Sequence, residues 1–335
     1  MARLKEHSLF EQRLKKAKEQ LTRLDNALFW PFVTLLLVGV VMLWAGQTKI
    51  GVACWVLVML LALVKLYVTK TRNVVSNAWL RESLRQDSRS PVLILRSFDT
   101  QGSAYRPPRA VGKALLSGES YFDDIGLASL GPLIAIGTGA RSAQPANAPD
   151  VLYLHTSDKD WFKVFELASK AARGIICAPG DSPGSIRELC TLCQSQMVTK
   201  IVFFMPPTPA KAHGLAAMNA RFSPFLDPGK VRKKWTEVRE SLREQGLRLP
   251  EYHSAGQLFI LENAERVISS LPLDAGPDLY LKELAEHIEE LFGRMPMSPG
   301  CPISELLQKT QPFEVPMRGT WLYRILCKPG MQPAS

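Results

Sequence analysis

Glu188 is the residue of this chain whose setting is best suited to chemistry. It lies in a predicted helix, Ser185–Gln196, that follows a short apolar run at Gly174–Cys177. A carboxylate at such a position can be shielded from water. It can then accept a hydrogen bond from a ribose hydroxyl or stabilise positive charge that develops on a sugar. The alternative is that Glu188 pairs with an arginine on the protein surface. The spacing of the residues leaves both interpretations open.

Polar residues and glycines follow three predicted strands, which are Pro91–Leu95, Leu133–Ile136 and Gly174–Cys177. An open α/β sheet binds its ligands in the crevice outside the carboxyl ends of its strands. We therefore expect the residues that follow these strands to gather at one edge of the sheet. The candidate ligand-binding residues found in this way are Arg96, Ser97, Phe98, Asp99, Gly137, Gly139 and Ser182.

Ser182 also fits a different kind of site. The segment Gly180–Gly184 matches G-x-S-x-G between a strand and a helix, which is the setting of a hydrolase nucleophile, and His253 or His287 could serve as the base. However, that design uses the backbone N–H of the residue after the serine, and Pro183 has none. The remaining interpretation is that Ser182 caps the helix and Pro183 occupies its first turn.

The sequence offers little evidence of a metal or cofactor site. Cys190 and Cys193 have C-x-x-C spacing, but no second pair accompanies them, which favours two residues on one helix face over a zinc site. The five histidines show no metal-ligand spacing. We expect no metal and no bound cofactor.

The elements that must position these residues alternate between strand and helix beyond Ser90, which predicts an α/β domain with a doubly wound, mostly parallel sheet of the flavodoxin-like type. Val151–Leu154 is predicted as a short strand or loop, and Gln257–Leu261 as the last strand. The remaining predicted elements are the strand Lys200–Met205 and the helices Tyr121–Leu130, Asp158–Ala172, Lys230–Gln245 and Leu279–Phe292.

Two long apolar runs precede this domain. Leu28–Ala45 is almost continuously apolar and would form a helix about 27 Å long, and Ile50–Val68 follows with a single charge, Lys65. Two such runs separated by four residues predict a pair of transmembrane helices rather than two core helices of a soluble protein. Tryptophans near the ends of the runs are typical of membrane interfaces.

The positive charge is concentrated around these runs. The chain has 41 Lys and Arg against 31 Asp and Glu, and residues 1–90 hold 14 of the basic and 6 of the acidic side chains. The remaining 245 residues are nearly neutral, which argues against nucleic-acid binding. Because basic residues flank the outer ends of the two runs, both termini are expected on the cytoplasmic side, with membrane lipid as a partner.

We therefore divide the chain into five parts. Residues 1–27 form a basic amphipathic segment that could lie on anionic lipid or pair with its copy in another subunit, and residues 28–68 contain the two transmembrane helices. A stalk at 69–90 leads to the α/β domain at 91–292, and a Pro-rich tail follows at 293–335.

The α/β segment resembles a Toll/interleukin-1 receptor (TIR) domain, and more narrowly the TIR-like domains of bacterial membrane proteins whose first strand reads PVLxLRSF. The resemblance covers about a third of the chain, roughly Pro91–Pro207. The matching segments are Pro91–Asp99 (PVLILRSFD), Leu130–Gly137 (LGPLIAIG), Asp158–Trp161 (DKDW) and Ser182–Leu189 (SPGSIREL).

The resemblance implies a function. In TIR enzymes the glutamate of the corresponding helix takes part in cleavage of the nicotinamide–ribose bond of NAD, and Glu188 is its counterpart. It also implies Trp161 as a ligand contact, NAD as a substrate rather than a cofactor, homo-oligomerisation, and a signalling or defence role at the bacterial inner membrane. The alternative is a non-catalytic membrane signalling or scaffold module that acts through self-association.

Overall fold

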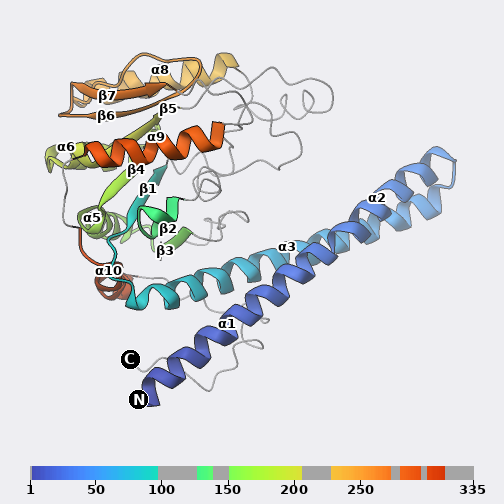
Figure 1. Ribbon diagram of the computed structural model, residues 1–335. Helices are drawn as coiled ribbons and strands as arrows, with labels where there is room; N and C mark the ends of the chain where they lie inside the picture. The colour runs from blue at the N-terminus through green and yellow to red at the C-terminus, as the bar shows by residue number, and fades with distance from the viewer. Residues whose placement is uncertain are drawn as a thin grey trace. The chain divides into compact units, whose positions relative to one another are not determined.

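The computed structural model describes residues 2–96, 127–138, 151–205, 228–272, 280–295 and 300–313 (Figure 1). The described residues form two compact units that meet in the chain between Ser83 and Leu84. The first unit is helical, and the second is an α/β unit.

Three helices make up the first unit. They are α1 (Ala2–Ala27), α2 (Phe29–Trp44) and α3 (Thr48–Ser83). Hydrogen bonds from the Leu28 amide to the Leu24 carbonyl and from the Phe32 amide to the Leu28 carbonyl carry the helical pattern from α1 into α2. A tight turn with Gly46 at φ +76° then reverses the chain, a conformation that favours glycine. The result is one long antiparallel hairpin (Figure 1).

Both arms of this hairpin carry a seven-residue repeat in their sequence, the spacing found in coiled coils. Gly39 lies so close to α3 that a Cβ atom there would be 3.2 Å from the Cys54 Cβ, and a Cβ on Gly51 would collide with Leu43. Small residues therefore let the arms approach closely in their apolar part. The repeat consists of Leu14, Leu21, Leu28, Leu35 and Met42 in the first arm, and of Cys54, Leu61, Val68, Val75 and Glu82 in α3.

Polar contacts link the arms where the apolar runs end. The Arg72 guanidinium is 2.7 Å from the Asp25 carboxylate, to which the Thr69 hydroxyl donates a second hydrogen bond at 3.1 Å. The Lys65 ammonium lies 5.0 Å from the centre of the Phe29 ring. In α1, Leu14, Ala17 and Leu21 pack against Val68 and Val75 of α3 in a buried cluster, and the expectation that residues 1–27 lie on lipid or pair with another subunit stays a prediction.

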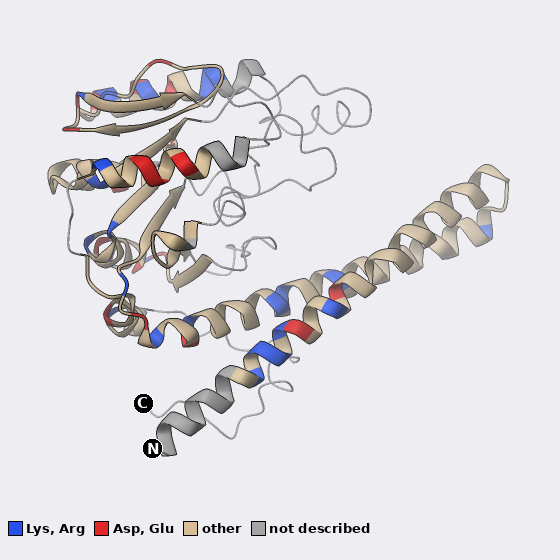
Figure 2. Ribbon diagram, viewed as in Figure 1, with Lys and Arg blue, Asp and Glu red and all other residues tan. Residues whose placement is uncertain are grey.

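The outer part of the hairpin is apolar and exposed. Figure 2 shows that charged side chains are almost absent from it and gather along the other half. Helices spanning Gln12–Trp44 and Thr48–Gln86 are long and apolar enough to cross a membrane, and only 6% and 17% of their most apolar windows are buried within the molecule. Trp30 and Trp44 are exposed near the two ends of α2, where aromatic side chains would meet the interfaces.

The α/β unit is built on a seven-stranded sheet with the order β3-β2-β1-β4-β5-β6-β7. Strands β1 to β5 are parallel, and β6 and β7 are antiparallel to their neighbours, so the mostly parallel sheet is confirmed. The flavodoxin order 2-1-3-4-5 places one strand beyond β1, whereas this sheet places two there. The strands are β1 (Val92–Arg96), β2 (Leu133–Thr138), β3 (Val151–Thr156), β4 (Gly174–Ala178), β5 (Ile201–Met205), β6 (Gln257–Leu261) and β7 (Val267–Pro272).

Helices cover both faces of the sheet. Apolar side chains of α9 (Tyr280–Arg294) pack against one face in the larger core cluster, while Trp235 of α8 (Pro228–Glu244) meets Phe259 on the other face. The helices α5 (Trp161–Ala171) and α6 (Pro183–Gln194) lie on the same face as α8. Short 3₁₀ turns complete the described part, at Leu84–Gln86, Leu127–Ser129, Met197–Lys200 and Gln311–Phe313.

Two elements were not predicted. Gln257–Leu261 is not the last strand, because β7 follows it, and the segment predicted as a tail contains α10 (Ile303–Thr310). The chain before α10 is fixed by hydrogen bonds from the Cys301 amide to the Ala171 carbonyl at 3.1 Å and from the Ile303 amide to the Arg89 carbonyl at 3.0 Å. Most of the predicted helix Tyr121–Leu130 lies outside the described residues.

Candidate functional site

The strand order reverses direction between β1 and β4. From β1 the sheet continues to β2 on one side, and from β4 it continues to β5 on the other. Arg96 and Ala178 form the last pair of this register, so both strands end at the same level. In doubly wound sheets the crevice beyond such a point is where ligands bind.

The turn from β4 into α6 is ordered by two serines. Ser182 is the N-cap of α6, and its hydroxyl oxygen accepts a hydrogen bond from the Ser185 amide at 3.2 Å. The Ser185 hydroxyl oxygen accepts one from the Gly180 amide at 3.3 Å. Because Ser182 is buried in this capping role and is followed by Pro183, the structure favours the helix cap over the hydrolase nucleophile.

Glu188 belongs to the buried stripe of α6. It is 3% exposed, and it shares the stripe with Ser185, Leu189 and Leu192 at helical spacing. Among the described residues no hydrogen bond or ion pair to its carboxyl group is found, and burial raises the pKa of this group to about 8. The alternative of a surface pair with arginine is not what the structure shows, because the neighbouring Arg187 lies 3.9 Å from the centre of the Phe162 ring.

Thiols lie beside this carboxyl group. Burial, and after it the proximity of Glu188 and Cys193, raises the pKa of the Cys177 thiol on β4 well above its ordinary value. Burial also raises the pKa of Cys193 to about 11. These thiols are therefore protonated and unreactive near pH 7. Within the described ranges, no group of three or more His, Cys, Asp or Glu side chains is arranged to hold a metal ion.

The other predicted site residues are distributed around the same edge of the sheet. Arg96 ends β1, and Trp161 begins α5 after β3, with its ring 5.3 Å from that of Phe162 in an edge-on contact. Gly137 was predicted in a loop, but it is buried within β2, where it pairs with His155. The backbone of β2 continues to Thr138 because the parallel ladder with β3 extends that far. Ser97, Phe98, Asp99 and Gly139 lie outside the described residues.

Two further residues near this edge were not among the predicted site residues. Asp181, in the turn after β4, lies 3.7 Å from the Lys234 ammonium of α8. His155 is 5% exposed near the end of β3, next to Tyr153. The position of His155 at a strand end was visible in the sequence, but the contact between Asp181 and Lys234 depends on how α8 packs and has no local signal.

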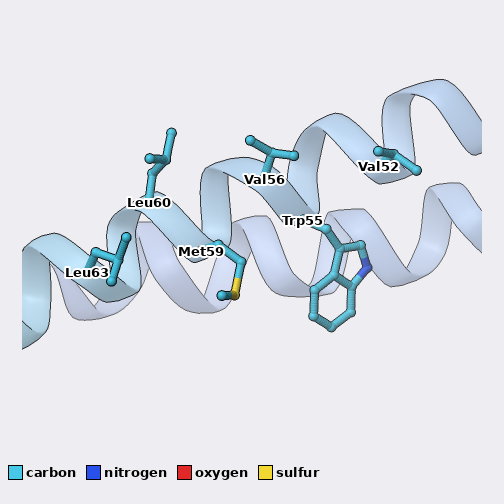
Figure 3. Close-up of a pocket in the computed structure, with 6 residues that line it drawn as sticks. All are labelled: Val52, Trp55, Val56, Met59, Leu60 and Leu63. Atoms are coloured by element: carbon cyan, nitrogen blue, oxygen red, sulfur yellow. The ribbon is translucent and has the colours of Figure 1, made fainter.

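A separate hollow lies on the helical hairpin. A shallow groove of about 330 Å³ lies along α3 and is lined by apolar side chains, six of which are drawn in Figure 3. Its residues project toward the surroundings of the hairpin, as those of a lipid-facing helix do. They are Val52, Trp55, Val56, Met59, Leu60 and Leu63.

Comparison with known proteins adds no relative, because no family model, curated protein or solved structure matches this chain.

Proposed function

We propose that this chain is a membrane-anchored effector whose cytosolic α/β domain binds a nucleotide beyond the carboxyl ends of β1 and β4. In this proposal the hairpin crosses the inner membrane twice, with both termini in the cytoplasm, as the basic residues near its outer ends favour. The observation that carries the proposal is the carboxyl group of Glu188, which is 3% exposed and has no partner among the described residues. A buried polar group without a partner costs stability, and a ligand that supplies the partner recovers that cost.

From the resemblance to TIR domains we take NAD as the proposed substrate. The bond between the ribose C1′ and the nicotinamide nitrogen breaks, and its electron pair leaves with nicotinamide. The positive charge that develops on the ribose is stabilised by the Glu188 carboxylate. Water then adds to C1′ and loses a proton, so the products are nicotinamide, ADP-ribose and one proton. The strand-end residues Arg96, Ser97, Phe98, Asp99, Gly137 and Gly139, with Trp161, would form the rest of the ligand site.

The pKa of Glu188 is consistent with this role. At about 8 it leaves the carboxyl group mostly protonated at neutral pH in the ligand-free protein. The cationic nicotinamide ring favours the ionised form and lowers the pKa, so that the carboxylate forms when the ligand is in place.

The experiment is nicotinamide release by the full chain, reconstituted at high density in lipid vesicles. We expect release by the wild type and a loss of at least about 100-fold in both Glu188→Gln and Glu188→Ala, because electrostatic groups of this kind contribute on that scale. Glu262→Gln, in the exposed turn between β6 and β7, is the matched control and should retain full activity. The proposed reaction is contradicted if the wild type releases no nicotinamide, or if both Glu188 variants release it as fast as the wild type.

The second candidate is the non-catalytic signalling or scaffold module. The observation that favours it is the exposed edge strand β7, whose side chains alternate between half-buried and exposed positions. A protein that only assembles would need such a surface and no reactive carboxylate.

A further inference from the structure

The two edges of the sheet differ in how they are covered. All six side chains of β3, at one edge, are buried. At the other edge, the side chains of β7 are alternately half-buried and exposed. An exposed edge strand presents backbone N–H and C=O groups that can pair with another strand.

β7 has a β-bulge at Ile268, where the pairing with β6 shifts by one residue, and it ends in Pro272, but it carries no charge of its own. Charged side chains, above all lysine, usually protect such an edge, but there is none between Val267 and Pro272. Ile268 in this strand is 47% exposed. Among the described residues of the α/β unit it is the only large hydrophobic side chain exposed by more than 36%.

The hydroxyl groups of the two serines in the middle of β7 accept hydrogen bonds from neighbouring side chains of the same chain. Arg294 of α9 donates a hydrogen bond to the Ser269 hydroxyl on one face of the sheet. Gln257 of β6 donates one to the Ser270 hydroxyl on the other face. Their small side chains therefore leave the outer backbone of the strand accessible.

We propose that β7 is a self-association surface, on which the β7 strand of a second copy of this chain pairs in the antiparallel direction. A two-fold axis perpendicular to the sheet produces this pairing and keeps each face of one sheet continuous with the same face of the other. The axis lies between the two strands, at the level of Ser269 or Ser270, so that this residue faces its own copy. Ile268 then lies opposite Ser270 or Pro272 of the partner subunit, and its exposed surface is covered.

The membrane anchor favours a second copy of this chain, rather than a free peptide, as the partner of β7. Pairing through one six-residue strand buries less than the roughly 1,200 Å² of a stable interface, so free molecules would associate weakly. Two chains anchored in one membrane have a much higher local concentration, which compensates for a small interface. This step rests on the membrane anchorage of the proposed function and not on its ligand or reaction.

The test is energy transfer between donor-labelled and acceptor-labelled full chains in vesicles of neutral lipid, without any ligand. The wild type should associate, and Ile268→Lys should weaken association at least about tenfold, because a charge would be buried at the paired edge. Ile268→Thr keeps a β-branched side chain without charge and should stay within about twofold of the wild type. Ser270→Lys provides a second charged variant at the exposed face.

The unfolding midpoint of each variant is measured alongside, and it should match that of the wild type because both side chains are exposed. A monomeric wild type at every density overturns the proposal. The proposal is also overturned if the charged variants that fold associate as strongly as the wild type. In that case the contact between copies lies in the membrane helices or elsewhere. Because nicotinamide release is not part of this measurement, failure of the reaction and failure of the surface are distinguished.

Discussion

Glu188 lies at 3% exposure on α6 beside the Cys177 thiol, and its carboxyl group has no partner among the described residues. Its place on the buried stripe follows from helical spacing and could be predicted. The absence of a partner could not, because it depends on every side chain that packs around it. The same holds for Arg187, whose contact with Phe162 requires α5 and α6 to lie side by side.

Glu188→Gln should change how stability depends on pH. The folded protein holds the Glu188 proton up to about pH 8, whereas the unfolded chain releases it near its ordinary pKa of 4.5. Between these values the folded state binds more protons, so the wild type loses stability as the pH rises. We expect the difference in the free energy of unfolding between the variant and the wild type to change little between pH 4 and pH 5. The variant should then become more stable than the wild type by a few kcal/mol at pH 8, at about 1.4 kcal/mol per pKa unit.

Denaturant unfolding of the full chain in detergent, followed at several pH values, measures this difference. Glu262→Gln, at an exposed position, should give a curve parallel to that of the wild type. Parallel curves for Glu188→Gln as well would mean that the carboxyl group is hydrated and not buried.

At the level of elements, the hairpin and most of the sheet could be predicted, because apolar runs and strand-to-helix alternation are local patterns. The strand β7 was missed because its apolar residues are interrupted by Ser269 and Ser270, and it is half exposed. The helix α10 was missed because it is short and follows a Pro- and Gly-rich stretch. Both are stabilised by tertiary contacts more than by their own sequence.

Arg72→Ala should destabilise the hairpin more than the double variant Asp25→Ala/Arg72→Ala. Removal of the arginine alone leaves the Asp25 side chain, 10% exposed, with only the Thr69 hydroxyl as the partner described above. An uncompensated buried charge costs about 3 kcal/mol or more, whereas removal of both charges costs less. A double-mutant cycle on thermal unfolding measures this. Arg23→Ala, exposed on α1, is the control, and equal losses in the single and double variants would contradict the expected coupling.

Gly300→Ala tests the segment that leads into α10. A Cβ atom at this position would lie 2.2 Å from the Ala171 carbonyl oxygen, so the segment must shift, at a cost of about 1–3 kcal/mol. Gly293→Ala is the matched control, because a Cβ there meets nothing within 4 Å and alanine favours the helix by up to about 1 kcal/mol. Opposite signs in the unfolding free energy are expected. A neutral Gly300→Ala would mean that the segment is not packed against α5.

At the scale of the whole molecule, the net charge of +10 is a property of the hairpin region more than of the α/β unit. α3 is a single helix from Thr48 to Ser83, which continues from the apolar part of the hairpin into its charged part. The sequence predicted the apolar run Ile50–Val68 and the stalk at 69–90 as separate segments.

Calorimetry with carba-NAD measures whether Glu188 meets a ligand beyond the ends of β1 and β4. Carba-NAD keeps the cationic nicotinamide but is not cleaved, and its binding to the full chain at pH 7 is measured in two buffers of different ionisation enthalpy. We predict that binding releases close to one proton, because the cation lowers a pKa of about 8, and that Glu188→Gln abolishes the release. An equal binding heat in both buffers, or an equal proton release by Glu188→Gln, would show that Glu188 does not meet this ligand.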